Sequence, residues 1–329
     1  MPASPASALR AGVLLALACN GLLGATGCSL GRCAALTNEA IDTGSATAIV
    51  AISGALAVDA RGRVLPFASS RTGEWMTLEH PVRDALSVPD RFEGGLVVGD
   101  AGFVAGASPG DMATWSSWPT PTSADLARIV PLELASGPRL ALLGPEVLLV
   151  SGEEGLREVA PPPGGWHELR DLVIVEELIW AVGAATLWTS ALPRPSGSAS
   201  WSAPIWTVHD LAPKGPLLGA VSVPPPTTAD PTLLFVFDAT TLYRVRPSGL
   251  IAALELSLEG QIIAAGGGVV TTSAGEVITL GEEELVIERH DLGVPLSASF
   301  GRYGHPFPLS ALGTTDGRII VQKSQRCYR

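Results

Sequence analysis

Charged and aromatic residues are scarce in this chain of 329 residues. Charged side chains make up 16% and aromatic side chains 5%, whereas hydrophobic side chains make up 47%. A charged fraction below the roughly 25% of ordinary soluble domains argues against intrinsic disorder. Among the 21 basic residues only Lys214 and Lys323 are lysines, and the formal net charge is −11. So acidic a chain repels phosphate backbones, and we expect no nucleic-acid partner.

The sequence also lacks the periodic patterns of collagen, coiled coils and amphipathic helices. Its 37 glycines have no three-residue period, no heptads persist, and no capped 3.6-residue stripe is sustained. From about Thr47 onward, short apolar runs alternate with Gly, Pro, Asp and Ser. Residues 241–246 place Tyr243 and Val245 on one face and two arginines on the other, as in a half-exposed strand. We expect an all-β chain.

One short unit recurs along the chain: an apolar run, a small or acidic residue, a few turn residues, and a second apolar run. Its mean spacing of about 42 residues is that of a four-stranded propeller blade. Residues 47–329 then accommodate a β-propeller of seven blades, and six or eight also fit because the spacing varies. The anchor residues of the seven units are Asp59, Gly99, Gly144, Gly183, Asp238, Thr272 and Thr314.

The first 27 residues have the pattern of a secretory signal peptide. Arg10 supplies a positive n-region, and the apolar stretch over 11–25 is too short for a comfortable membrane span. Residues 25–28, Ala-Thr-Gly-Cys, resemble a bacterial lipobox, with Ala25 where Leu is preferred. We expect lipidation of Cys28, a short linker over 28–46, and an exported protein held at a membrane by its lipid alone. Ordinary cleavage, for instance after Ala18, is the alternative.

Of the four cysteines, two belong to the N-terminal segment and two are left for the mature chain. Cys19 would leave with the signal segment and Cys28 would carry lipid, so Cys33 and Cys327 remain. An oxidising compartment permits these two to form a disulfide that joins the ends of the mature chain, and two unpaired thiols are the alternative. No Cys-x-x-Cys pair occurs, so the cysteines indicate no zinc or thioredoxin-type site.

Four tryptophans follow the recurring units at intervals close to one blade. In propellers a tryptophan that recurs once per blade wedges between adjacent sheets, which is the role we expect here. A stacking platform for a ligand is the alternative, and it would require several of them on one exposed rim. The four are Trp75, Trp115, Trp166 and Trp201.

Residues 95–104 and 108–115 together resemble a repeat of the bacterial-neuraminidase-repeat superfamily. Within that superfamily they are most similar to the propellers of photosystem II assembly factors. The turn of that family runs Ser-x-Asp-x-Gly-x-Thr-Trp; Ser108, Thr114 and Trp115 match it, while the acidic residue shifts to Asp111. Residues 151–155 form a partial copy without Trp, and residues 68–75 equally resemble a quinoprotein-type propeller motif. The resemblance implies a propeller fold with structural turns.

No catalytic constellation is recognised in the sequence. Residues 106–110 spell Gly-x-Ser-x-Gly, but Pro109 lacks the N–H that an oxyanion hole requires at that position. A sialidase would need clustered arginines and a nucleophilic Tyr with an acidic partner, and its N-terminal Arg-Ile-Pro motif is absent. The five histidines are scattered without metal-ligand spacing. We therefore expect no catalytic residue, metal site or cofactor.

These observations favour a non-enzymatic interaction or scaffold module of the bacterial cell envelope. Its expected location is the periplasmic face of a membrane, the outer membrane or the cell surface, and its partners would be envelope proteins, which the sequence does not identify. The alternative is a propeller that binds or cleaves carbohydrate at its central channel. That alternative would require two carboxylates about 5–10 Å apart beside Arg or Tyr.

Overall fold

A computed structural model of the protein describes most of the chain after residue 32. The expected signal segment 1–27, Cys28 and Trp201 lie outside the described residues. The described ranges are 33–68, 71–88, 92–108, 111–134, 137–152, 155–175, 178–191, 204–211, 213–223, 232–245, 251–266, 269–280, 286–300 and 311–327.

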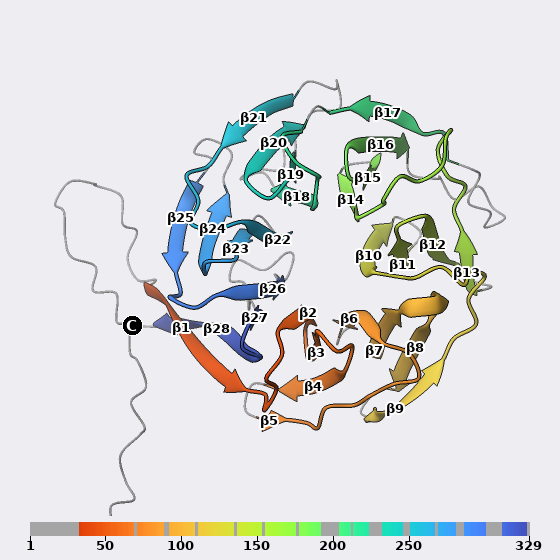
Figure 1. The fold of residues 1–329 in the computed structure, drawn as a ribbon. Helices are drawn as coiled ribbons and strands as arrows, with labels where there is room; N and C mark the ends of the chain where they lie inside the picture. The colour runs from red at the N-terminus through yellow and green to blue at the C-terminus, as the bar shows by residue number, and fades with distance from the viewer. Residues whose placement is uncertain are drawn as a thin grey trace, which may run out of the picture.

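The strands form seven antiparallel sheets of four strands, arranged as blades around a central axis (Figure 1). This confirms the prediction of an all-β, seven-bladed β-propeller. In every blade the strands follow chain order from the axis outward, except that the last blade takes its outermost strand from the beginning of the chain. A single short 3-10 turn, η1 (Asp100–Gly102), interrupts the strands among the described residues.

The first four blades span the chain from Ile49 to Asp210. Blade 1 comprises β2 (Ile49–Ser53), β3 (Leu56–Asp59), β4 (Val64–Ala68) and β5 (Arg71–Thr72). Blade 2 comprises β6 (Val82–Val88), β7 (Phe92–Gly99), β8 (Val104–Ser108) and β9 (Asp111–Ser117). Blade 3 comprises β10 (Arg128–Leu134), β11 (Gly137–Gly144), β12 (Val147–Gly152) and β13 (Gly155–Glu158). Blade 4 comprises β14 (Asp171–Val175), β15 (Leu178–Val182), β16 (Thr186–Ala191) and β17 (Thr207–Asp210).

The last three blades complete the ring. Blade 5 comprises β18 (Gly219–Val223), β19 (Leu233–Phe237), β20 (Thr241–Val245) and β21 (Ile251–Glu255). Blade 6 comprises β22 (Ile262–Gly266), β23 (Val269–Thr272), β24 (Glu276–Leu280) and β25 (Val286–Asp291). Blade 7 comprises β26 (Leu296–Phe300), β27 (Ala311–Thr314), β28 (Arg318–Cys327) and β1 (Cys33–Asp42).

Blade 7 closes the ring by joining the two ends of the described chain. Strand β1 pairs antiparallel with β28 over ten consecutive residues, from Cys33 opposite Cys327 to Asp42 opposite Arg318. The linker that we expected over 28–46 therefore includes a strand of the propeller. Residues 33–42 carry no copy of the recurring unit, and β1 pairs only with a strand from the other end of the chain.

The seven recurring units of the sequence are the hairpins between the second and third strand of each blade. Their turns require special residues: Gly62, Gly275 and Gly317 have positive φ values of 75°, 108° and 86°, which glycine adopts without steric cost. Asp59, in the same turn as Gly62, and Asp238 also close their turns by accepting N–H groups from residues two to four positions onward. Asp and Gly therefore recur in the sequence units because the hairpin turns require them.

We call the end of the ring that carries these hairpin turns the turn face. The connections that lead from each outermost strand to the next blade lie at the same end. The Leu126 N–H, for example, donates to the carbonyl of Gly99 at 3.0 Å, and the Leu169 N–H donates to the carbonyl of Pro145 at 2.8 Å. Each such bond joins one blade's turn to the segment that enters the next blade.

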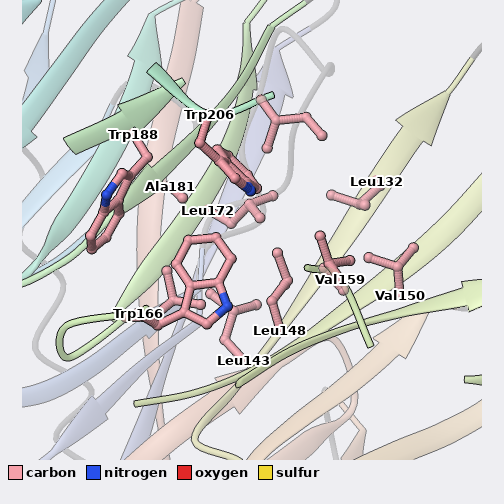
Figure 2. Packing of buried hydrophobic residues seen from close by; sticks show 13 residues of the cluster. Leu132, Leu143, Leu148, Val150, Val159, Trp166, Leu172, Ala181, Trp188 and Trp206 are labelled. Atoms are coloured by element: carbon pink, nitrogen blue, oxygen red, sulfur yellow. The ribbon is translucent and has the colours of Figure 1, made fainter. Parts of the chain in front are cut away.

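Buried apolar side chains fill all seven interfaces between neighbouring blades. A single blade has two apolar faces and buries them only by stacking on both neighbours, so a closed ring leaves neither face exposed. The interface of blades 3 and 4 contains three tryptophans (Figure 2). Trp166 meets Trp188 edge-on at 5.4 Å and Trp206 at 5.0 Å between ring centroids, a geometry that aromatic pairs favour.

Candidate functional site

The innermost strand of each blade carries one residue at an equivalent position around the ring. Each of these residues pairs with the residue just before the turn anchor of its own blade, so the seven positions correspond around the ring. Four of the seven are Gly or Ala, and the other three are charged and consecutive. In blade order the positions are Ala51, Asp84, Arg128, Asp171, Gly219, Ala264 and Ala298.

We call the three charged residues, Asp84, Arg128 and Asp171, the axial cluster. The Asp84 carboxylate accepts the N–H of its neighbour Ala85 at 2.8 Å and reaches across to accept the N–H of Ile129 in blade 3, also at 2.8 Å. A side chain of blade 2 thereby holds the innermost strand of blade 3.

Asp171 makes the same kind of connection one interface further on. Its carboxylate accepts the N–H of Leu172 at 2.7 Å and the N–H of Ala220 in blade 5 at 2.9 Å. The Nε of Arg128 lies 3.3 Å from its Oδ1 and so ties blade 3 to blade 4. A Cβ on Gly219 would lie 2.7 Å from Oδ2 of this carboxylate, so the absence of a side chain at 219 permits the approach. Side chains thus join four consecutive blades close to the axis.

Burial dominates the electrostatics of the axial cluster. It raises the pKa of Asp84 to about 6, against the opposing influence of the Ile129 N–H and of Arg128. Burial also raises the pKa of Asp171, which Arg128 and the two backbone N–H groups oppose. A carboxylate taken out of water loses hydration that hydrogen bonds and one arginine replace only in part. The Arg128 side chain has 38% of its surface exposed, against 3% for Asp171.

The chemistry available to this cluster is limited by the bonds it already makes. A general acid with a pKa near 6 suits catalysis, and Asp84 has such a pKa. Both of its oxygens, however, accept backbone N–H groups that would lose their partners if the carboxylate turned to a substrate. Arg128 is the positively charged group of the cluster, and its partly exposed side chain is the one suited to an anionic ligand.

Two further arginines lie close to the starts of innermost strands. Arg83 pairs with Asp100 at 2.6 Å, and Arg170 donates to Glu168 at 2.8 Å and to the carbonyl of Leu217 at 2.9 Å. The pKa of Asp100 is lowered by the hydrogen bond from Arg83. Arginines therefore follow one another in blades 2, 3 and 4, but each is paired with a carboxylate. Their charge is largely compensated within the protein.

A tyrosine with an acidic partner is also present, away from the axis. The Tyr243 hydroxyl donates to Oδ2 of Asp238 at 2.8 Å and accepts the N–H of Lys214. Both side chains are buried, and burial together with Asp238 raises the pKa of the phenol. A nucleophilic tyrosine requires the opposite, a phenol that loses its proton readily. This pair fastens the blade 5 hairpin to the segment before β18.

The residues singled out in the sequence lie in several parts of the ring. Trp75 packs against the core between blades 7 and 1 and donates its indole N–H to the carbonyl of Thr43 at 2.9 Å. Trp115 packs against the core between blades 1 and 2, and Trp166 is buried between blades 3 and 4. Ser108 pairs with Asp111 at the hairpin of β8 and β9. Within the described part of the chain, no group of His, Cys, Asp and Glu side chains is arranged to hold a metal ion.

The axial cluster was missed by sequence reasoning. Each member begins or nearly begins an apolar run, as in Asp171-Leu-Val-Ile-Val175, where a charged residue reads as the solvated end of a strand. The available signal was positional: all three lie 12 to 16 residues before the anchor of their unit. Only the pairing register of the first two strands in each blade shows that these positions are equivalent.

Comparisons with known proteins identify the fold. No family model matches the chain, and no curated protein matches it in sequence. Selenomethionine-substituted virginiamycin B lyase from Staphylococcus aureus superposes with a TM-score of 0.62 at 12% identity, over 88% of this chain and 99% of that chain. A catalytically inactive form of that lyase, with quinupristin, gives 0.60 at 12% identity and the same coverage. BBS1N in complex with ARL6DN gives 0.59 at 15% identity, over 83% and 88%. At such identities the likeness shows the propeller fold.

Proposed function

We propose that this protein is an exported, lipid-anchored β-propeller that acts as a non-enzymatic interaction module of the bacterial cell envelope. One observation carries the proposal: the two carboxylates of the axial cluster are used to hold neighbouring blades together. Asp84 and Asp171 each accept a backbone N–H from the following blade. Carboxylates that serve as acceptors for the backbone are occupied structurally, which leaves the flat faces of the ring for binding to partners. Among the structural neighbours, BBS1N was solved in complex with another protein.

The position of the proposed anchor favours the turn face as the binding surface. Strand β1 begins at Cys33, five positions after Cys28, and runs toward the turn face, which it reaches at Asp42. Cys33 therefore lies at the opposite end of blade 7. Five residues span at most about 18 Å, so a lipid on Cys28 would hold that opposite end near the membrane. The turn face would point away from the bilayer.

Metabolic labelling tests the anchor. We expect palmitate to label the wild-type chain, and Cys28→Ala to abolish the label and release the protein from the membrane fraction. Cys19→Ala is the matched control, because Cys19 lies within the segment that would be removed, and it should label like the wild type. Equal labelling of Cys28→Ala and wild type would remove the lipid anchor from the proposal. Retention of the chain in the cytoplasm would remove export as well.

A second function, recognition or cleavage of an anionic carbohydrate at the channel, is favoured by Arg128. It is more than one-third exposed and stands between two carboxylates, and an arginine fork is suited to a carboxylate ligand. The lyase among the structural neighbours is an enzyme on the same fold. Titration with N-acetylneuraminic acid and assay with a fluorogenic sialoside test this function. Binding or turnover that Arg128→Gln weakens at least tenfold would support it, and neither binding nor turnover would exclude this ligand.

A further inference from the structure

The two cysteines that remain after signal removal lie directly opposite each other in the closing blade. Cys33 is the first residue of β1 and Cys327 is the last residue of β28, and the register pairs them. Directly opposite residues of antiparallel strands have Cα atoms about 4.5 to 5.5 Å apart. Disulfides form between Cα atoms about 4.4 to 6.8 Å apart. The backbone therefore places the pair at bonding distance.

We propose that Cys33 and Cys327 form a disulfide that clasps the propeller ring shut. The ring is otherwise closed at this blade by the backbone pairing of β1 with β28 and by the apolar cores on either side of blade 7. Strands at the ends of a chain fray unless they are tied down. A covalent bond at the outer end of the β1–β28 ladder would prevent β1 from peeling away at its free end.

The bond forms by thiol–disulfide exchange with a disulfide donor such as oxidised glutathione. One cysteine thiolate attacks the donor and releases one glutathione, which leaves a mixed disulfide on the protein. The second thiolate then displaces the other glutathione and forms the Cys33–Cys327 bond. The two protein thiols lose two electrons to the donor, and their two protons appear on the two molecules of glutathione. In a bacterium the periplasm is oxidising, and there protein disulfide donors take the part that oxidised glutathione takes in the purified system.

Folding and oxidation of the two cysteines are thermodynamically linked, so the clasp can be detected from the ratio of oxidised to reduced protein. If folding brings the two sulfurs together, the folded chain favours the disulfide by the same factor by which the disulfide favours the folded chain. In unfolded chain, the two cysteines are separated by nearly the whole sequence and meet rarely. The oxidised form should therefore predominate in folded protein and lose that advantage in urea.

The test uses the purified full chain with Cys19→Ser and Cys28→Ser, equilibrated with a reduced and oxidised glutathione buffer. Mass mapping without reductant should find a peptide that joins Cys33 to Cys327. We expect the ratio of oxidised to reduced protein to be about 30-fold or more higher in buffer than in concentrated urea. Reductant should lower the Tm by about 5 °C, whereas the further variant Cys33→Ser should melt at one temperature with and without reductant.

Two results would overturn the clasp: free Cys33 and Cys327 thiols in folded protein after equilibration, or equal oxidation in buffer and in urea. The clasp rests on the backbone register alone and is tested with purified protein. Its failure would leave export and anchoring standing. A clasp that forms in the purified chain but is reduced in cells would instead count against the proposed export.

Discussion

At the residue scale, the axial cluster shows how burial rather than sequence neighbours sets the properties of a side chain. Asp84 and Asp100 are both aspartates of blade 2, but burial raises the pKa of Asp84 to about 6, while Arg83 lowers the pKa of Asp100. A carboxyl group whose pKa is raised by folding stabilises the folded state when it is protonated. The two residues should therefore affect stability in opposite directions as the pH changes.

Asp84→Asn tests the pH dependence that follows. The stabilisation by protonated Asp84 is fully present below its unfolded pKa of 3.8 and is lost as the pH rises through about 6. That difference in pKa corresponds to roughly 3 kcal/mol. We expect Asp84→Asn to destabilise the protein more at pH 4 than at pH 7, by about that amount, because the amide cannot titrate. Urea unfolding across this range measures it.

Asp100→Asn serves as the control for that experiment. The pKa of Asp100 is already lowered, so its contribution to stability changes below pH 4. Its profile should run parallel to that of the wild type between pH 5 and 7. Parallel profiles for Asp84→Asn and wild type over the whole range would contradict a buried, titrating carboxyl group at the axis.

Two glycines, one in blade 5 and one in the segment before it, differ in how much room their surroundings leave for a side chain. Replacing each with alanine distinguishes crowding at the site from the general effect of replacing a glycine. A Cβ at Gly219 would meet Asp171 Oδ2 at 2.7 Å and the ring of Phe237 at 3.1 Å, whereas a Cβ at Gly215 would lie 3.7 Å from Asp238. We expect Gly219→Ala to cost about 1–3 kcal/mol through crowding, and Gly215→Ala to be neutral or slightly stabilising. Chemical denaturation of both variants checks this. Equal effects would show that Asp171 does not need the open space at 219.

At the element scale, the hairpin turn between the second and third strand is the repeated device of the ring. Asp59 in blade 1 is fully buried and binds the N–H groups of Arg61 and Arg63, the Arg63 guanidinium and the Thr47 hydroxyl. Burial opposes its ionisation, but these hydrogen bonds together lower its pKa. Asp316 occupies the corresponding turn of blade 7 with 55% of its side chain exposed, paired with Arg318.

These two aspartates should differ sharply when they are removed. Asp59→Ala leaves two backbone N–H groups and a partly buried guanidinium without their acceptor, and we expect a loss of about 3 kcal/mol. Asp316→Ala removes an ion pair that water screens, and we expect a loss of less than about 1 kcal/mol. Thermal and urea unfolding compare them. A difference of less than about 1 kcal/mol between the variants would show that burial of the turn aspartate contributes little.

Much of this element-level structure was predictable, because turns impose local chemistry. The seven units that recur in the sequence coincide with the seven hairpins, since each turn needs an aspartate, threonine or glycine at a fixed place. The axial cluster was not predictable in the same way. Its members serve contacts with other blades, such as Asp84 with Ile129, and no local pattern marks a residue whose partner lies in the next blade.

At the scale of the whole molecule, ring closure depends on a contact between the ends of the chain. The repeat length favoured seven blades, because each blade occupies a similar stretch of sequence, but the variable spacing also allowed six or eight. The pairing of β1 with β28 was not predicted, because residues 33–42 carry no copy of the unit and pair with a strand from the far end of the chain. The closed ring leaves the turn face as the broad surface that the proposed anchor would present to partners.

Site-specific photo-crosslinking in living cells can show whether partners bind at the turn face. A photoreactive residue is placed at Glu146 or Thr315, exposed positions in turns of blades 3 and 7, or at Ser116, an exposed position on the outermost strand of blade 2. We expect discrete protein adducts from one or both turn positions and none from Ser116. Adducts from Ser116 alone, or no adducts from any of the three positions, would contradict an interaction module that works through its turn face.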